Sequence, residues 1–384
     1  MNMRNLSIII LSSLWGLVSC GGGYVKPVEA SQTGVSLSFF NHVNAVSGAD
    51  ENVVTSPYSA AVCLSMLAEG AGGKTRAEFD SALGGIMFKA EDLGSNDTVV
   101  VKSANSIWID DNFSIRNSYV NLLQKDFDAF ITTQRFSDPA TVKAINNWCL
   151  EHTEGKIGDM IDRLSPGMVM VLVNALYFNA PWADAFDPEL TSEDVFYGKS
   201  KSGKVSMMHR TGQYNYAQVS GAQIIQLPYE GGRYSMFVAL PPAGADLDKL
   251  IPHITEGAFN SALEMMSPKR VKLSLPKFKV ETFMLLNKAL QNMGIRTAFT
   301  PAADFRGIAE MGPLVLDQVK QKCYVEVAEK GTEAAAVTVA QIRLTSVRVN
   351  PEDMAVMIVD RPFVFMIADG YTGNILFAGK IVNL

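Results

Sequence analysis

The sequence predicts an α+β fold in a single domain. Helical patterns fill the first half of the chain, strand patterns fill the second half, and no Pro/Gly/Ser-rich linker divides residues 35–384. Runs of helices followed by runs of strands are typical of α+β proteins, in which helices stack against large sheets. The chain has 384 residues, of which 48% are hydrophobic and 19% charged, so it is globular and long enough for an extensive core.

Two helices are expected from a start signal followed by a buried pattern. The pair Ser-Pro at 56–57 marks a helix start, and residues 60–71 are small and apolar, as a buried helix requires. A second helix is expected from the Asp-Pro pair at 138–139 to about residue 155.

The strands of the second half are expected from apolar runs. Residues 171–178 are almost entirely apolar and predict a strand that is covered on both faces. A turn at 370–374 joins two of the later runs. The further strands are expected at 235–240, 271–278, 363–368 and 375–382.

The first twenty residues have the pattern of a bacterial lipoprotein signal peptide. A mostly apolar run from 6 to 18 follows Arg4 and is too short to span a bilayer, which needs about 20 residues. The run ends at Leu17-Val18-Ser19-Cys20, which resembles a lipobox, so Cys20 is expected to carry lipid and anchor the protein in a membrane. An ordinary signal peptide with an incidental Cys is the alternative.

The residues after Cys20 extend this expectation. Residues 21–34 are expected to form a flexible tether, and residues 35–384 the folded domain. No acidic residue follows Cys20 closely, which favours an outer membrane lipoprotein that faces the periplasm or the cell surface.

Composition and spacing exclude several classes of function. The net charge of −6 argues against nucleic acid as a partner. The four Cys and four His residues are dispersed without CxxC or HExxH spacing, so no metal site and no cofactor is expected. Gly73-Lys74-Thr75 resembles the end of a phosphate-binding P-loop, but Ala68 stands where its first Gly belongs. No local motif indicates an enzyme, although a Ser/His/Asp set that meets only in space stays open.

Residues 329–346 combine features of a strand and of a mobile loop. From 332 to 343 the charged side chains occupy odd positions, whereas the even positions are uncharged and mostly small: Thr332, Ala334, Ala336, Thr338, Ala340 and Ile342. Alternate side chains of a strand face opposite sides, so the even face could enter a packed sheet without burying charge. The Gly and the three consecutive Ala residues are poor choices for a permanent strand. This pattern indicates conditional insertion, and a surface loop with chance parity remains an equal alternative.

The same segment resembles a known family. Residues 329–336, with the hinge residues Glu329, Gly331, Thr332, Glu333, Ala334, Ala335 and Ala336, are similar to the hinge of the reactive loop of inhibitory serpins. Further serpin-like motifs follow in the family's order over nearly the whole mature chain, at 52–59, 70–75, 145–157, 174–182, 227–229, 275–278, 361–363 and 376–379. The resemblance implies three β-sheets, eight or nine helices and an exposed reactive loop at about 329–350.

The resemblance also implies a function without catalytic residues. A monomeric serpin is bait for serine proteases, and cysteine proteases are a further class of target. Counting fourteen residues from Gly331 places the cleaved bond at Thr345–Ser346, with Arg343 and Leu344 as alternative registers. Thr at that position favours elastase-like or subtilisin-like proteases, and Arg343 admits trypsin-like ones. A non-inhibitory binding protein of the same family is the rival hypothesis.

Two further groups of residues are implied by family position. Trp182 and Lys277 are expected beside Glu329 at the breach, where the central sheet opens. The shutter, midway along the sheet, is expected to contain Ser56, Ser59, Asn174 and Gln321. Gln321 stands where the family often has His, so a pH-sensitive shutter is not expected. The segment 84–102 is short, which implies a reduced form of the helix that binds polyanions in some relatives.

Overall fold

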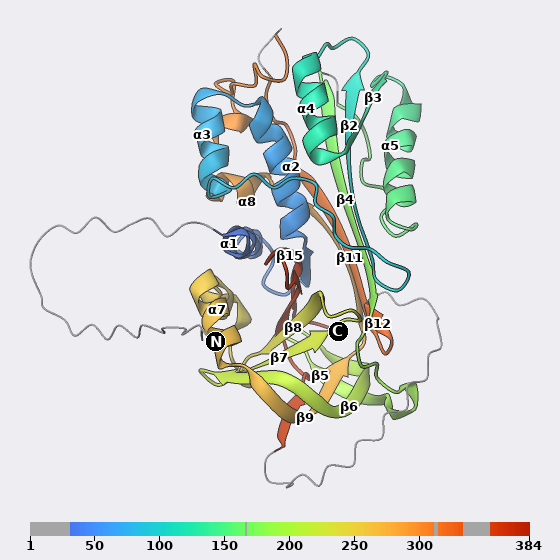
Figure 1. Ribbon diagram of the computed structural model, residues 1–384, viewed down its shortest axis with the longest axis vertical. Helices are drawn as coiled ribbons and strands as arrows, with labels where there is room; N and C mark the ends of the chain where they lie inside the picture. The colour runs from blue at the N-terminus through green and yellow to red at the C-terminus, as the bar shows by residue number, and fades with distance from the viewer. Residues whose placement is uncertain (1–30, 166, 311–313, 333–353) are drawn as a thin grey trace, which may run out of the picture.

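The computed structural model describes residues 31–165, 167–310, 314–332 and 354–384. Eight α-helices and fifteen strands are formed by these residues, which agrees with the expected α+β fold. Most helices gather at one end, and the long strands run from them towards a second, strand-rich end (Figure 1).

Several helices begin directly after a residue whose side chain caps the first turn. Pro57 occupies the first turn of α2, and the hydroxyl of Ser56 accepts a hydrogen bond from Ser59 N at 3.3 Å. Ser31 caps α1 in the same way, so residues 32–34 of the expected tether are helical. The helices are α1 Gln32–Asn44, α2 Pro57–Gly70, α3 Gly73–Ala82, α4 Asn117–Phe127, α5 Pro139–His152, α6 Leu247–Leu250, α7 Glu256–Met265 and α8 Asn287–Asn292.

A six-stranded sheet forms the long side of the molecule. Its strand β4 was expected, whereas β2 and β3 come from the first half of the chain and were not. In spatial order the strands are β10 Phe278–Leu285, β11 Lys320–Ala328, β12 Gly331–Thr332, β4 Met170–Pro181, β2 Val100–Asp110 and β3 Ala129–Gln134.

The other nine strands are hydrogen-bonded into one continuous set among the described residues. The long strand β6 pairs with β5 through residues 202–207, with β9 through residues 207–216 and with β7 through residues 215–219, which joins what would otherwise be two sheets. In spatial order the strands are β1 Val53–Thr55, β15 Ile375–Ile381, β14 Phe363–Asp369, β8 Tyr234–Leu240, β7 Ala222–Pro228, β6 Ser202–Val219, β9 Ser267–Pro276 and β13 Ala355–Ile358, with β5 Ser192–Tyr197 beside β6.

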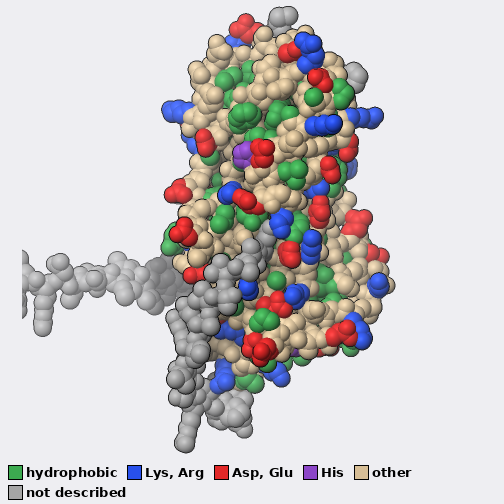
Figure 2. All heavy atoms as spheres, turned by 90° about the vertical axis from the view of Figure 1, so that its right-hand side faces the viewer, with side chains coloured by type: hydrophobic (Ala, Val, Ile, Leu, Met, Phe, Trp, Pro, Cys, Tyr) green, Lys and Arg blue, Asp and Glu red, His purple; other side chains and the backbone are tan. Residues whose placement is uncertain are grey.

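The six-stranded sheet is covered on both faces. Its inner face packs on α2 in the main core, through even residues of β4 such as Leu176 and Phe178. Its outer face packs under α5, where Val173 and Ala175 contact the group that contains Trp148 (Figure 1). Figure 2 shows Lys and Arg side chains scattered among Asp and Glu on this side of the molecule.

The short segment between α3 and β2, where a reduced helix was expected, is irregular. Residues 83–99 contain no helix. The side chain of Arg233 donates to Asp92 O at 3.0 Å, and the hydroxyl of Tyr234 donates to Leu93 O at 2.6 Å, so β8 and its preceding turn hold this segment. Among the described residues, no helix has the length and apolar character needed to cross a bilayer.

Candidate functional site

The sheet is open between β4 and β11. The two-residue strand β12 lies between them at one end, where Thr332 is opposite Ala180 and Val327. Beyond β12, residues 170–179 of β4 pair only with β2 among the described strands, and residues 320–326 of β11 pair only with β10. We call the space between these two unpaired edges the slot, and the end that holds β12 its hinge end.

Thr332 is already seated at the hinge end of the slot. Its side chain is 2% exposed, and its hydroxyl lies 2.5 Å from the hydroxyl of Tyr229. Tyr229 is fully buried and stacks on Trp182 with the ring centres 4.5 Å apart. Burial raises the pKa of Tyr229, so its phenol stays neutral and can donate or accept. The inward direction of Thr332 confirms the expected parity at its first position.

Gly331 is required by the close approach of β4. A Cβ atom built on Gly331 would lie 2.1 Å from the carbonyl oxygen of Ala180. Any other residue would therefore push β12 away from β4.

The expected breach residues lie together beside this strand. Lys277 Nζ is 2.9 Å from Glu329 Oε2, and the hydroxyl of Thr191 donates to Glu329 Oε1 at 3.0 Å. The indole of Trp182 donates to Ala328 O at 2.9 Å. Thr191 and Tyr229 were not foreseen in this group, although Tyr229 belongs to one of the motifs that carried the resemblance.

The carboxyl of Glu329 is stabilised as an anion. Burial opposes its ionisation, but hydrogen bonds from Lys277, its own backbone and Thr191 outweigh that effect and hold the pKa of Glu329 below its usual value. The ion pair with Lys277 therefore persists at neutral pH at the point where the chain leaves β11.

The expected shutter residues form one hydrogen-bonded network midway along the slot. The Gln321 side chain accepts from Thr55 Oγ1 at 2.5 Å and from Ser56 N at 3.1 Å, and donates to Ser56 O at 2.9 Å. Ser56 caps α2 through Ser59 N, and the hydroxyl of Ser59 donates to Asn174 Oδ1. These bonds connect β11 to β4 through the start of α2.

The network continues beyond the residues that were expected. Asn174 Nδ2 donates to Asn105 Oδ1 at 2.6 Å, and Asn105 Nδ2 donates to Phe127 O at 2.7 Å. Asn105 was missed because it lies in no motif, and Thr55, although it lies in the motif 52–59, was missed because its partner Gln321 is distant in sequence.

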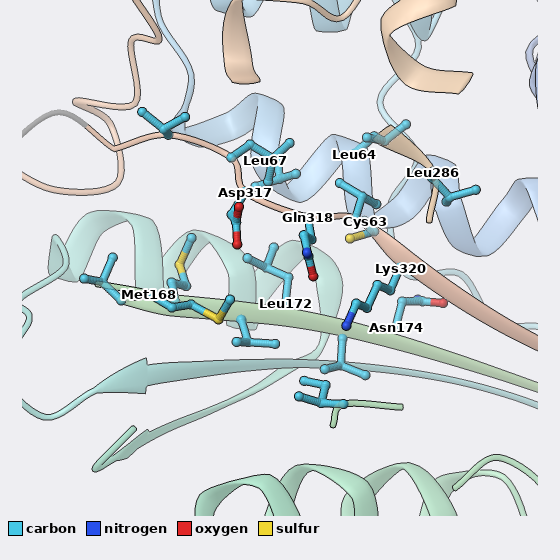
Figure 3. A pocket seen from close by; sticks show the side chains of 18 of the residues that line it. Cys63, Leu64, Leu67, Met168, Leu172, Asn174, Leu286, Asp317, Gln318 and Lys320 are labelled. Carbon is cyan, nitrogen blue, oxygen red and sulfur yellow. The ribbon is translucent and has the colours of Figure 1, made fainter. Parts of the chain in front are cut away.

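The far end of the slot opens into a cavity of about 770 Å³. Cys63, Leu64 and Leu67 line it from α2, Leu172 and Asn174 from β4, and Asp317, Gln318 and Lys320 from the segment that leads into β11 (Figure 3). Its volume lies within the range of about 300–1,000 Å³ that ligand pockets have.

Several expected site residues lie outside the described residues: Cys20, Glu333, Ala334, Ala335, Ala336, Arg343, Leu344, Thr345 and Ser346. Within the described residues, no group of three or more His, Cys, Asp or Glu side chains could hold a metal ion.

A serine–histidine pair lies between β5 and β6. His209 Nε2 lies 2.9 Å from Ser192 Oγ, and its Nδ1 lies 2.9 Å from Ser274 Oγ. Both ring nitrogens are thus bonded to serine hydroxyls, and neither is bonded to the carboxylate that a Ser-His-Asp triad needs.

Comparison with known proteins agrees with the fold. The model of the serpin family, described as serine protease inhibitor, matches residues 30–384. An uncharacterized serpin-like protein of Thermococcus kodakarensis is 32% identical over 375 residues, which cover 94% of this chain and 87% of the relative. A serine protease inhibitor of Cyanea capillata is 33% identical, with 91% and 96% covered. The crystal structure of the thermophilic serpin tengpin in its native state has a TM-score of 0.84 at 29% identity, with 96% of each chain covered.

These matches confirm the family that the hinge and the ordered motifs indicated. Serpins are mostly protease inhibitors rather than catalysts, so proteases are the class of partner that the family implies. The chain belongs to the serpin family of serine protease inhibitors.

Proposed function

We propose that this chain is an inhibitory serpin that traps a protease as a covalent acyl-enzyme while its own reactive loop enters the slot. The observation that carries the proposal is the position of Gly331 and Thr332. They already pair with β4 and β11, while both strands keep unpaired edges ahead of them. A further strand that continues from Thr332 would satisfy both edges.

The trapping reaction uses the catalytic group of the protease. Its serine attacks the carbonyl carbon of Thr345, the bond to the nitrogen of Ser346 breaks, and the amine of Ser346 leaves with a proton. The serine is then joined to Thr345 as an ester; a cysteine protease would form the corresponding thioester. Cleavage frees the residues after Thr332 to insert. About 14 residues at 3.3 Å each would carry the protease about 46 Å, before water can release it.

The cleavage register sets the class of target. Thr345 suits the small primary pockets of elastase-like and subtilisin-like proteases. Cleavage after Arg343 would suit trypsin-like enzymes, and cleavage after Leu344 chymotrypsin-like ones. We place the bond at Thr345–Ser346 because serpin hinges count fourteen residues from the position of Gly331.

We also propose that the inhibitor is tethered to a bacterial outer membrane through lipid on Cys20. The apolar run that ends at Ser19-Cys20 supports this location. The anchored chain would then face proteases of the periplasm or of the cell surface.

One experiment separates inhibitor, binder and enzyme. The purified protein is mixed with a panel of serine and cysteine proteases and run on a denaturing gel. A covalent band at the summed mass supports the proposal. Clean loop cleavage with every protease and no such band would favour a non-inhibitory binding protein, and turnover of unrelated substrates would favour an enzyme.

A further inference from the structure

We propose that Met168 and Met170 form an oxidation site, at which a peroxide that enters the cavity at the far end of the slot converts the two thioethers into sulfoxides. The inference concerns the native chain, so it goes beyond the proposed function and does not depend on it. It follows from the access that the cavity gives, from the chemistry of its sulfur atoms and from the packing of both side chains.

The cavity gives a small oxidant access to the interior. Its volume is about 770 Å³, whereas a water molecule occupies about 30 Å³ in the liquid, and hydrogen peroxide is only slightly larger. Asp317 and Gln318 line the cavity and are exposed, so it communicates with solvent. The polar part of its lining, which includes Gln318 and Lys320, offers hydrogen bonds to water and to peroxide (Figure 3).

The two methionines line this cavity and are only partly buried. Met170 is the first residue of β4, and Met168 lies two residues before it. Both side chains are half-buried, and Figure 3 shows Met168 on the β4 side of the cavity. Met66 and Met208, by contrast, are 1% and 0% exposed and do not line the cavity. A peroxide in the cavity would therefore meet the sulfur atoms of Met168 and Met170 without any opening of the fold.

Thioethers, rather than the thiol, are the reactive sulfur groups of this cavity. Cys63 also lines it, but burial raises the pKa of that thiol to about 12, so it stays protonated at neutral pH and reacts slowly. A thioether loses no proton before it reacts. Its sulfur lone pair attacks one oxygen of hydrogen peroxide and the O–O bond breaks. The sulfur gives up two electrons, the hydroxyl proton passes to the leaving oxygen, and the products are a sulfoxide and water.

Oxidation at these positions would disturb the packing on both sides of the six-stranded sheet. Met170 packs against the main core, which contains Leu64 and Leu67. Met168 packs against the group under α5 that contains Trp148. A sulfoxide is polar and chiral, so it loses part of the apolar contact that the thioether makes. The oxidised protein should therefore unfold at a lower temperature than the untreated protein.

Peroxide treatment of the folded protein tests the access. The protein is incubated with hydrogen peroxide for increasing times, the reaction is quenched, and mass spectrometry of its peptides measures the addition of one oxygen at each methionine. Met265, which is 56% exposed, should react first, and Met168 and Met170 should follow. The buried Met66 and Met208 should react at least about tenfold more slowly than the two cavity residues. Oxidation of Met168 and Met170 that is as slow as that of Met66 and Met208 would overturn the proposal.

The variant Met168→Leu with Met170→Leu tests the consequence. Leucine replaces methionine at nearly constant volume and forms no sulfoxide, so the variant should melt close to wild type before treatment. After treatment, wild type should melt about 2 °C or more lower, whereas the variant should change much less.

The matched control is Met265→Leu with Met354→Leu, which removes two exposed thioethers and leaves the cavity unchanged. It should lose as much melting temperature on treatment as wild type does. An equal loss in wild type and in the Met168→Leu, Met170→Leu variant would place the effect elsewhere and overturn the proposal. Neither measurement uses a protease, so its outcome is independent of the proposed function.

Discussion

The hydroxyl of Tyr229 and the hydroxyl of Thr332 lie 2.5 Å apart inside the core. Thr332 is the first inward side chain of the expected hinge, and Gly331 and Thr332 already pair with β4 and β11. The stack of Tyr229 on Trp182 fixes the phenol that receives it. Under the proposed function, insertion would therefore start from two residues that already lie beside β4.

Thr332→Arg should convert the inhibitor into a substrate. The change places an unpaired charge in a position that is 2% exposed, at a cost of several kcal/mol, so the loop would insert slowly. The protease would complete deacylation first and leave a cleaved chain with little covalent complex, as a denaturing gel would show. Glu333→Arg, one residue along and expected to face outward, is the control. Undiminished complex with both variants would argue for the non-inhibitory alternative.

Glu329→Gln should lose stability at neutral pH and not in acid. A carboxyl whose pKa is lowered by folding stabilises the native state above its unfolded pKa of about 4.3, and this contribution disappears as the pH falls through the folded pKa. The variant should unfold about 0–1 kcal/mol more easily than wild type at pH 7, and the two should converge below about pH 4. Urea unfolding at both pH values measures this, and a constant difference would rule out the Lys277 pair as its source.

Gln321→Leu should destabilise the shutter by about 1–3 kcal/mol. The change leaves the buried hydroxyl of Thr55 and both backbone groups of Ser56 without their side-chain partner. Thermal unfolding of the native protein is the measurement. Gln318→Leu is the matched control, since Gln318 is exposed and should change stability by less than about 0.5 kcal/mol.

Thr345→Arg should redirect inhibition towards trypsin-like proteases, whose acidic primary pocket accepts Arg. Mass spectrometry of the fragment released from wild type should show a start at Ser346. A fragment that starts at Leu344 or at Thr345 would move the bond to Arg343 or to Leu344.

Cys20→Ser should release the protein from the membrane fraction, because the thiol is the expected site of lipid attachment. Detergent extraction and blotting of fractionated cells measure the partition. A variant that still sediments with membranes would exclude the lipobox interpretation.

The sequence could predict the elements whose burial is uniform. The apolar runs of β4, β14 and β15 and the capped start of α2 needed no knowledge of partners. The strand β2 was missed because it carries polar residues such as Ser103 and Asn105. Asn105 is buried with a hydrogen bond to Phe127 O, a partner that no periodicity reveals.

The residues of the candidate site likewise divide into those that the sequence could predict and those that it could not. Family position correctly grouped Lys277 with Glu329 and Gln321 with Ser56, and parity correctly turned Thr332 inward. Tyr229 could not be assigned to the hinge from sequence, because it lies 103 residues from Thr332 and meets it only through the fold. The union of the sheets through β6 likewise depends on the pairing of β6 with β9, which follows in the chain only after β7, β8, α6 and α7.

The three cysteines of the described chain, Cys63, Cys149 and Cys323, are free thiols. Burial raises the pKa of each to about 12, so these thiols stay protonated at neutral pH. Thiolates, not thiols, react with oxidants and with disulfides. These three residues therefore form no cross-link in the folded chain, and their protonated thiols should react slowly with oxidants and disulfides.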